Sequence, residues 1–339
     1  MAELVWPHKR PLSEIQTERS PTPQIIASHH YPARQCSPEH KHTPWMNRLI
    51  QAERSTALYA LLPEFRGSID LIYIDPPFMT GRTFTTGNQV AYHDHWNNNI
   101  DLYLDWLYET LALLHALLTP NGSLYVHLDW RATHYAKLLL DEIFGGSPHK
   151  NGPGFKNEII WHYQSGGHAH RYYARKHDTI LLYTKSARYC FHGERVAVSR
   201  GAQRRNHMRK KVDGAGKVSW TIRSGSRVYT YHEDSPMLLS DVWSDISHLH
   251  QKDPERTGYA TQKPIALLER LILASSEEHD LVLDCFCGSG VTPIAAEQLK
   301  RRWIACDSSK LAITTTCERL QTLPHLQPFA LQHIISIPP

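Results

Sequence analysis

Four consecutive residues, Asp75-Pro76-Pro77-Phe78, combine a carboxylate, two prolines and an aromatic ring in a way that could serve chemistry. Each proline holds φ at about −65° and lacks an N–H, so the main chain there offers only carbonyl acceptors. The Asp75 carboxylate and the Pro76 carbonyl then form a rigid pair of acceptors, which suits a substrate that donates two N–H bonds, such as an exocyclic amino group. Phe78 offers a face on which a planar base can stack. The alternative is a proline-stiffened loop in which Asp75 only caps a helix.

A glycine-rich turn later in the chain, Asp284-x-Phe286-x-Gly288-x-Gly290, could hold a ligand. Glycine has no Cβ, so the main chain can approach a ligand closely. Asp307 ends the next apolar run, and an acid in that place can accept hydrogen bonds from ribose hydroxyls. The third glycine of a dinucleotide fingerprint is absent, which favours a smaller adenosyl ligand. A tight turn without any ligand is the alternative.

Both motifs follow short apolar runs, 70–74 and 281–284, that are typical of buried parallel strands. Elsewhere, apolar runs alternate with segments whose apolar residues recur at helical spacing. The pattern predicts strands at 123–128, 159–161, 179–183 and 303–307, and helices over 47–61, 100–118, 131–144, from Pro264, over 292–299 and over 308–321. This alternation predicts an α/β fold with an open, doubly wound, mostly parallel sheet that helices cover on two faces. Ligands bind beyond the carboxyl ends of such strands, where both motifs lie.

The composition of the 339 residues indicates a folded chain, with 41% hydrophobic residues and a net charge of +4. It excludes a mainly disordered chain, a collagen-like repeat and a small disulfide-rich domain. No apolar run is long enough to span a bilayer, and the first residues lack the apolar core of an export signal. The six cysteines show no Cys-x-x-Cys spacing, so we expect reduced thiols in a cytoplasmic protein without membrane contact.

Changes in composition divide the chain into five segments. We expect an extended N-terminal arm at 1–45, two halves of one α/β domain at 46–185 and 260–325, a basic insert at 186–259 and a C-terminal tail at 326–339. The arm is rich in proline and histidine, and its spacing of metal-binding residue types fits no zinc-finger pattern. We therefore predict a polar arm and no metal site. The residues considered for zinc are His29, His30, Cys36, His40 and His42.

The insert carries a block of basic residues interleaved with aromatic residues, and residues 186–231 contain only two acids, Glu194 and Asp213. Such a surface suits the phosphates and base edges of a nucleic acid. The candidate nucleic-acid contacts are Arg204, Arg205, Arg209, Lys210, Lys211, Arg223 and Arg227. A solvated basic surface loop is the alternative.

Taken together and in this order, the motifs resemble those of DNA amino-methyltransferases that use S-adenosylmethionine, in the circularly permuted arrangement called the β group. In that group the catalytic motif comes first, then the target-recognition region, and then the cofactor motif. This chain has DPPF, then the basic insert, then TQKP at 261–264 and FCGSG at 286–290. The similarity covers about residues 46–321. It implies a Rossmann-like methyltransferase fold and S-adenosylmethionine as the cofactor.

The resemblance assigns the catalytic role to the DPPF motif. Asp75 and Pro76 would hold the target amino group, with Pro77 completing the rigid loop, and Phe78 would stack on the base. Hydrogen bonding would then make the amino nitrogen more nucleophilic, and no enzyme nucleophile is required. The two cysteines of the glycine-rich turn are therefore expected only to pack beside the pocket.

The resemblance implies a second set of residues that bind the cofactor. Lys263 would lie near the methionine carboxylate and Asp307 near the ribose. The family commonly has Gly-Asp near the adenine, whereas this chain has Ala52-Glu53, so Glu53 is expected to substitute. The full expected set is Glu53, Lys263, Asp284, Phe286, Gly288, Gly290 and Asp307.

The implied function is a site-specific DNA methyltransferase that flips an adenine out of the duplex and methylates its N6 amino group. Within the family, Asp at the first position of the catalytic motif goes more often with adenine than with cytosine. The alternatives are a cytosine-N4 enzyme, a methyltransferase for RNA or protein amides, and a catalytically silent nucleic-acid-binding module. Double-stranded DNA is the expected partner, and the sequence leaves open a homodimer and a restriction-enzyme partner. His93, Asp94, His95 and Trp96 form either a turn before the next helix, which we favour, or a flap over the base.

Overall fold

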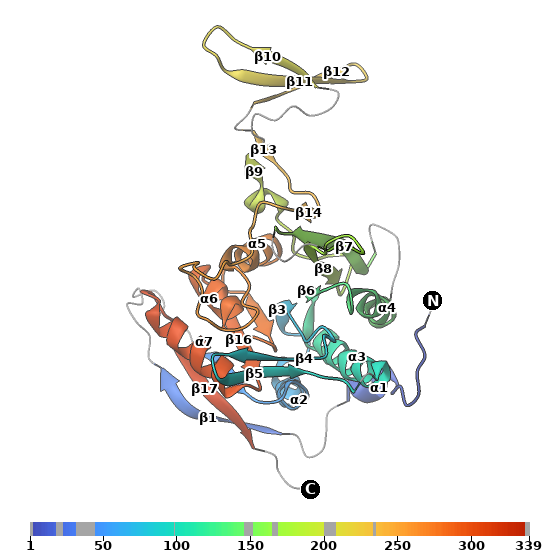
Figure 1. The fold of residues 1–339 in the computed structure, drawn as a ribbon, viewed down its shortest axis with the longest axis vertical. Helices are drawn as coiled ribbons and strands as arrows, with labels where there is room; N and C mark the ends of the chain where they lie inside the picture. Colours follow the sequence, from blue (N-terminus) through green and yellow to red (C-terminus); the bar gives the residue numbers. More distant parts are fainter. Residues whose placement is uncertain are drawn as a thin grey trace. The chain divides into compact units, whose positions relative to one another are not determined.

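The computed structural model describes residues 3–17, 23–31, 45–97, 99–145, 152–164, 169–199, 208–232 and 235–335. The chain divides into two compact units (Figure 1). Unit 1 comprises residues 1–190 and 241–339, and unit 2 comprises residues 191–240. Within the described ranges, no helix combines the length and the apolar character that crossing a bilayer requires.

Unit 1 is built on a sheet of ten described strands in the order β1-β17-β2-β16-β15-β3-β6-β8-β7-β14. In that order the strands are Gln24–Tyr31, Phe329–Ile335, Asn47–Gln51, Arg302–Asp307, Leu281–Asp284, Ile69–Ile74, Leu118–Leu128, His177–Thr184, Gly154–His162 and Val242–Trp243. All neighbours from β17 to β6 are parallel. Antiparallel pairing joins β1 to β17, and β8 to both β6 and β7. The expected α/β fold with a mostly parallel sheet is confirmed.

The helices of unit 1 form two groups. Helix α3 (Ile100–Leu117) packs against α2 (Arg54–Phe65) and α4 (Thr133–Phe144), whereas α6 (Val291–Gln298) packs against α5 (Ile265–Ser275) and α7 (Lys310–Thr322). Figure 1 shows the first group in blue to green and the second in orange to red. The central strands β3 and β15 are buried along almost their whole length. Such strands are apolar throughout because both faces of the sheet are covered.

The helix expected over 47–61 is wrong in its first half, where the structure has β2, paired on both sides with β17 and β16. Leu49 and Ile50 are fully buried in this strand. A short apolar run of this kind suits a covered strand as well as a helix, so periodicity alone does not separate them. Glu53 marks the boundary, because its carboxylate accepts hydrogen bonds from two N–H groups in the first turn of α2.

The N-terminal segment contains regular structure that its composition does not predict. It includes helix α1 (Leu12–Ile15), and the side chains of Trp6 and Ile15 belong to the main hydrophobic core. Strand β1 pairs with β17, which lies in the expected C-terminal tail. Because β1 is an exposed edge strand, it has no buried face and hence no apolar alternation to predict it. Of the residues considered for zinc, His29 and His30 lie in β1, and Cys36, His40 and His42 lie outside the described residues.

Unit 2 consists of short strands. A one-turn 3-10 helix, η2 (Gly193–Val196), precedes β9 (Val198–Ser199), which pairs with β13 (Pro236–Met237). A three-stranded antiparallel sheet is formed by β10 (Arg209–Val212), β11 (Val218–Ser224) and β12 (Arg227–His232). In unit 1 a separate hairpin, β4 (Arg82–Thr86) with β5 (Gln89–Asp94), follows the DPPF motif.

Candidate active site

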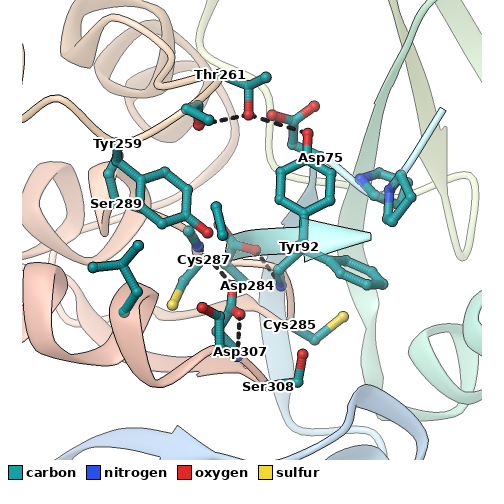
Figure 2. Close-up of a pocket in the computed structure, with 18 of the residues that line it drawn as sticks. Asp75, Tyr92, Tyr259, Thr261, Asp284, Cys285, Cys287, Ser289, Asp307 and Ser308 are labelled. Carbon is teal, nitrogen blue, oxygen red and sulfur yellow. Dashed lines mark hydrogen bonds between the residues drawn. The ribbon is translucent and has the colours of Figure 1, made fainter. Parts of the chain in front are cut away.

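The two motifs lie at the ends of neighbouring strands. β3 and β15 pair in parallel, with Ile72 opposite Leu283, so the loops that follow them leave the sheet at the same edge. Both loops line one cavity of about 880 Å³ in unit 1, a volume usual for small-molecule sites. Figure 2 shows Asp75 and Asp307 in this cavity with the Tyr92 ring drawn between them. Of the expected site residues, the cavity lining contains Glu53, Asp75, Pro76, Pro77, Phe78, Lys263, Asp284, Phe286, Gly288 and Asp307.

Asp75 has one oxygen that is paired and one that is not. Its Oδ2 lies 2.7 Å from the Lys263 Nζ, and both side chains are largely buried. Its Oδ1 is buried and has no hydrogen-bond partner among the described residues. A buried acceptor without a partner costs free energy. A ligand donor that reaches Oδ1 therefore forms a hydrogen bond without breaking one within the protein. Lys263 also lies over the Phe78 ring, with Nζ 5.3 Å from the ring centroid.

The loop after the DPPF motif is anchored by Asp94 at the end of β5. Its carboxylate accepts hydrogen bonds from the N–H groups of Met79 (3.0 Å) and Thr80 (2.7 Å) and from the Trp96 Nε1 (2.8 Å). Asp94 is almost fully buried, and Met79 has a positive φ of 62°. His93 and Asp94 belong to β5, so of the expected turn 93–96 only His95 and Trp96 lie between this strand and the region before α3. The Asp94 carboxylate holds the DPPF loop. Sequence reasoning missed this role, for which an acid two residues before a tryptophan was the available signal.

Phe78 is supported from within the sheet by His127 of β6. The two rings stack with centroids 6.3 Å apart and an interplanar angle of 20°. His127 is fully buried, and its ring nitrogens lie 2.9 Å from the Tyr73 hydroxyl and 3.2 Å from the Asp178 carboxylate. Burial alone would raise the pKa of Asp178, but its hydrogen bond with His127 keeps that pKa below the usual range. A histidine inside an apolar strand was the signal that sequence reasoning left unused.

Asp284 is hydrogen-bonded to residues of the glycine-rich turn and of α6, the helix that follows it. The Asp284 carboxylate accepts hydrogen bonds from the Phe286 N–H (2.9 Å) and the Thr292 hydroxyl, and burial raises its pKa to about 7. Gly288 lines the cavity with φ of 50°, whereas Gly290 does not line it. A Cβ at Gly290 would lie 2.6 Å from a side-chain oxygen of α7, and φ there is 79°.

Asp307 connects two turns at the cavity. Its carboxylate accepts hydrogen bonds from the N–H groups of Gly288 (2.9 Å) and Ser309 (2.8 Å). Burial nevertheless raises the pKa of Asp307 to about 6. Each carboxylate oxygen has a second lone pair, so Asp307 keeps the capacity to accept hydrogen bonds from a ligand.

Aromatic side chains form the wall of the cavity near Glu53. The Phe286 and Trp106 ring centroids are 5.5 Å apart, and the Arg54 guanidinium lies 4.9 Å from the Trp106 centroid. Arg54 is fixed by an ion pair with the buried Glu109 at 2.6 Å. Glu53 itself is half-exposed and caps α2, so it borders the cavity while it stabilises the helix.

The cysteines of the glycine-rich turn are not placed for nucleophilic chemistry. Cys285 and Cys287 are both buried, and burial raises the pKa of each thiol far above its usual range. The thiolate is the reactive form of cysteine, so these residues act in packing.

The expected DNA contacts belong to unit 2 where the structure describes them. Arg209, Lys210 and Lys211 lie in β10, Arg223 lies in β11, and Arg227 begins β12. Arg204 and Arg205 lie outside the described residues.

The chemistry of the cavity suits S-adenosylmethionine. Asp75, Asp284 and Asp307 place three carboxyl groups around one space, and their mutual repulsion contributes to the raised pKa of Asp284. A cationic ligand such as a sulfonium relieves that repulsion. The aromatic wall offers an apolar surface to a planar ring, and Asp307 offers acceptors to hydroxyl groups.

Comparisons with known proteins show the family of this chain. A family model for DNA methylases matches residues 69–318. The type II methyltransferase M.HpaI of Haemophilus parainfluenzae is 32% identical over 270 residues, which cover 79% of this chain and 73% of that protein. The DNA adenine methyltransferase YhdJ of Escherichia coli K12 is 30% identical over 260 residues, which cover 76% of this chain and 78% of that protein.

Solved structures share the fold. The cytosine-N4-specific PvuII DNA methyltransferase aligns with a TM-score of 0.53 and 17% identity, over 80% of this chain and 86% of that chain. The putative DNA modification methylase TTHA0409 of Thermus thermophilus, complexed with S-adenosylmethionine, aligns with a TM-score of 0.52 and 18% identity, over 87% of this chain and all of that chain. The expected methyltransferase fold and cofactor are thus confirmed. The chain belongs to the DNA methylase family of S-adenosylmethionine-dependent amino-methyltransferases that act on adenine N6 or cytosine N4.

Proposed function

We propose that this enzyme methylates the N6 amino group of adenine in double-stranded DNA, after the base has left the helix. The observation that carries the proposal is the state of Asp75, whose Oδ1 is buried and lacks a hydrogen-bond partner among the described residues. This oxygen and the neighbouring Pro76 carbonyl supply two acceptors for the two N–H groups of an exocyclic amine. No other group in the cavity lining offers such a pair on a proline-stiffened loop.

The mechanism follows from the weakness of the nucleophile. The lone pair of an aromatic amine is conjugated into the ring, so the nitrogen attacks poorly. Hydrogen bonds to Asp75 and Pro76 draw the two N–H groups out of the ring plane and increase electron density on the nitrogen. S-adenosylmethionine, when bound, supplies the electrophilic methyl group, and its sulfur leaves as a neutral thioether. The amine nitrogen forms the new bond to the methyl carbon and loses one of its two protons to solvent. The protein then needs only to position the reacting groups, because no covalent intermediate with the enzyme is formed.

Phe78 holds the extruded base in this proposal. Removing a base from the duplex costs roughly a few kcal/mol. Stacking on an aromatic side chain recovers about 1–3 kcal/mol per base. The stack of Phe78 on the buried His127 keeps the Phe78 ring at a fixed angle to the loop, which favours this role.

Lys263 acts on Asp75 in our proposal. The resemblance implies a contact between Lys263 and the methionine carboxylate, but the ammonium lies 2.7 Å from Asp75 Oδ2. We infer that Lys263 orients the carboxylate so that Oδ1 faces the amine, which makes it a positioning residue. A contact with the methionine carboxylate would be an additional role, and the variants described in the Discussion separate the two.

Asp307, Phe286 and Gly288 hold the cofactor in our proposal. Asp307 accepts hydrogen bonds from the ribose hydroxyls, Phe286 packs against the adenine, and Gly288 allows the main chain to approach. Asp284 and Gly290 stabilise the conformation of the turn in our proposal. Asp284 accepts a hydrogen bond from its own loop, and Gly290 packs on α7. Glu53 borders the aromatic wall, where it can accept a hydrogen bond from the adenine amino group.

The sheet β10–β12 of unit 2 binds DNA in our proposal, chiefly through one face. Side chains alternate between faces of a strand, and the pairing register extends this alternation across the sheet. One face carries Arg209, Lys211, Ser219, Thr221, Arg223, Val228, Thr230 and His232, whereas the other carries Lys210, Val212, Val218, Trp220, Ile222, Ser224, Arg227, Tyr229 and Tyr231. The first face has cations and hydroxyls without acids, which suits phosphates and base edges.

Adenine is favoured over cytosine by two observations. The catalytic motif begins with Asp75, and YhdJ, a relative at 30% identity, is named as an adenine methyltransferase. We further propose that the chain belongs to the β group, in which the catalytic motif precedes the cofactor motif. We also propose that the protein is cytoplasmic. A homodimer and a restriction-enzyme partner stay hypotheses without a supporting observation of their own.

A transfer assay tests the proposed function. The protein is incubated with genomic DNA and tritiated S-adenosylmethionine, and the labelled nucleosides are separated after digestion. We expect N6-methyladenine as the product. N4-methylcytosine as the sole product would overturn the base assignment, and cofactor binding without transfer to any nucleic acid would support the silent module.

A further inference from the structure

An exposed group of aromatic and basic side chains lies at the catalytic edge of the sheet, and neither motif accounts for it. The group consists of Trp130, just after β6, and Tyr172, Tyr173 and Arg175, just before β8; we call it the Trp130 patch. Tyr173 is 98% exposed, Tyr172 61% and Trp130 43%. Large aromatic side chains exposed together mark a binding surface more often than a structural one.

The topology places this patch beside the catalytic loop. β6 is the neighbour of β3, with Val126 opposite Ile74, and it pairs antiparallel with β8. The end of β6 and the start of β8 therefore leave the sheet at the edge where Asp75 follows β3. His127 of β6 contacts Phe78 and the Asp178 carboxylate, which links the base of the patch to the DPPF motif.

Three members of the patch, Trp130, Tyr172 and Arg175, contact one another. The Arg175 guanidinium lies 3.8 Å from the Trp130 ring centroid and 4.8 Å from that of Tyr172. Arg131 lies 4.8 Å from the same tryptophan centroid. An exposed guanidinium held between aromatic rings is suited to a phosphate or to the face of a base.

The positive charge of the patch favours a negatively charged partner. Residues 170–177 contain three Arg or Lys side chains and no acid. Bases stack on exposed aromatic rings, and phosphates bind guanidinium groups. A nucleic acid supplies both chemistries next to each other.

We propose that the Trp130 patch grips the DNA strand beside the flipped base, with Tyr173 stacked on a neighbouring base and Arg175 bound to a phosphate. This inference rests on the proposed function. It adds a DNA contact in unit 1, on the same rigid sheet as Asp75, to the contacts proposed for unit 2. A contact on that sheet fixes the position of the DNA relative to the catalytic loop.

The test uses the full chain with Tyr173→Ala, Tyr173→Phe and Arg175→Gln, and with Lys300→Gln as the control. Lys300 is an exposed cation before β16, at the opposite edge of the sheet. Methyl transfer to unmethylated plasmid DNA gives kcat and the KM for DNA, and calorimetry gives the Kd for S-adenosylmethionine. We expect Tyr173→Ala to raise the KM for DNA about tenfold, with the cofactor Kd unchanged and with Tyr173→Phe and the control near wild type.

Direct binding separates the failure of this inference from the failure of the proposed function. Anisotropy of a fluorescein-labelled duplex is measured for each variant over a range of salt concentrations. Arg175→Gln should weaken binding and reduce the slope of log K against log salt by about one. If wild type binds the duplex without methylating it, the proposed function fails while this measurement still decides on the patch. Binding by Tyr173→Ala and Arg175→Gln within twofold of wild type, at every salt concentration, would overturn the patch.

Discussion

The corner after β3 and the corner after β15 line the same cavity, yet the carboxylates at the two corners differ in their hydrogen bonding. At the first corner, Asp75 keeps one buried oxygen without a partner among the described residues, and the prolines remove the N–H groups that could have satisfied it. At the second corner, Asp284 accepts a hydrogen bond from the Phe286 N–H of its own turn, and Asp307, at the end of the neighbouring β16, accepts hydrogen bonds from the N–H groups of Gly288 and Ser309. In our proposal the first corner therefore reserves acceptors for a substrate, whereas the acids of the second corner already have hydrogen-bond partners within the protein.

We propose that the first corner carries the reaction and that the second binds the cofactor within the same cavity. An unsatisfied acceptor is costly to keep in a folded protein, so its presence beside Lys263 indicates a group that a ligand satisfies. Satisfied acids and a close glycine turn give a preformed surface that loses little entropy when a cofactor binds. Variants at the two corners should accordingly affect different measurements.

The largest expected effect is at Asp75. Asp75→Ala removes the acceptor for the amine, so methyl transfer should fall by about a thousandfold or more, while the Kd for S-adenosylmethionine changes little. Filter-binding of tritiated product and calorimetry of the cofactor measure the two quantities. Wild-type turnover by this variant would remove Asp75 from the mechanism.

The opposite corner should respond in binding and stability. In Gly290→Val the new side chain meets Thr316 and the residue keeps a positive φ of 79°, so the free energy of unfolding should drop by about 3 kcal/mol and cofactor affinity should fall. Gly145→Val is the matched control, because φ is 76° there and a Cβ has nothing within 4 Å. Urea unfolding of both variants measures the difference. Equal losses at the two positions would show that the contact with α7 does not matter.

Variants of Lys263 show whether this side chain acts on Asp75 or binds the cofactor. Lys263→Met leaves Asp75 without its cation, so kcat should fall about a hundredfold with little change in the cofactor Kd, and Lys263→Arg should recover part of the rate. Single-turnover rates and calorimetry separate the two effects. A large rise in the cofactor Kd at unchanged kcat would instead assign Lys263 to the methionine carboxylate.

The smallest effect is a pH dependence at Asp307. Burial raises the pKa of this carboxyl to about 6, and ribose hydroxyls donate better to its ionised form. Binding therefore favours ionisation, so cofactor affinity should increase about severalfold as the pH rises through 6 and should level off above it. Calorimetry of wild type and Asp307→Asn over this range isolates the contribution, because the titration of the cofactor itself is common to both. A ratio of the two Kd values that stays constant with pH would contradict the assignment.

The positions of both corners could be predicted from the sequence, because each follows a short apolar run and ends at residues that break a strand. Contacts between distant segments could not. The ion pair of Lys263 with Asp75 joins residues 188 positions apart, and the anchoring of the DPPF loop by Asp94 depends on the path of a hairpin. Strand β1 was missed for a different reason: an exposed edge strand buries no face, and its sequence therefore carries no period.

The location of unit 2 within the sequence has a consequence for engineering specificity. Its residues, 191–240, fall between β8 and β14, whereas the cavity described above is lined by residues that belong to unit 1. In our proposal, exchanging this stretch for its counterpart from a relative would leave the catalytic and cofactor-binding residues of unit 1 unchanged. Such chimaeras should retain the same methylated atom while reading a different target sequence.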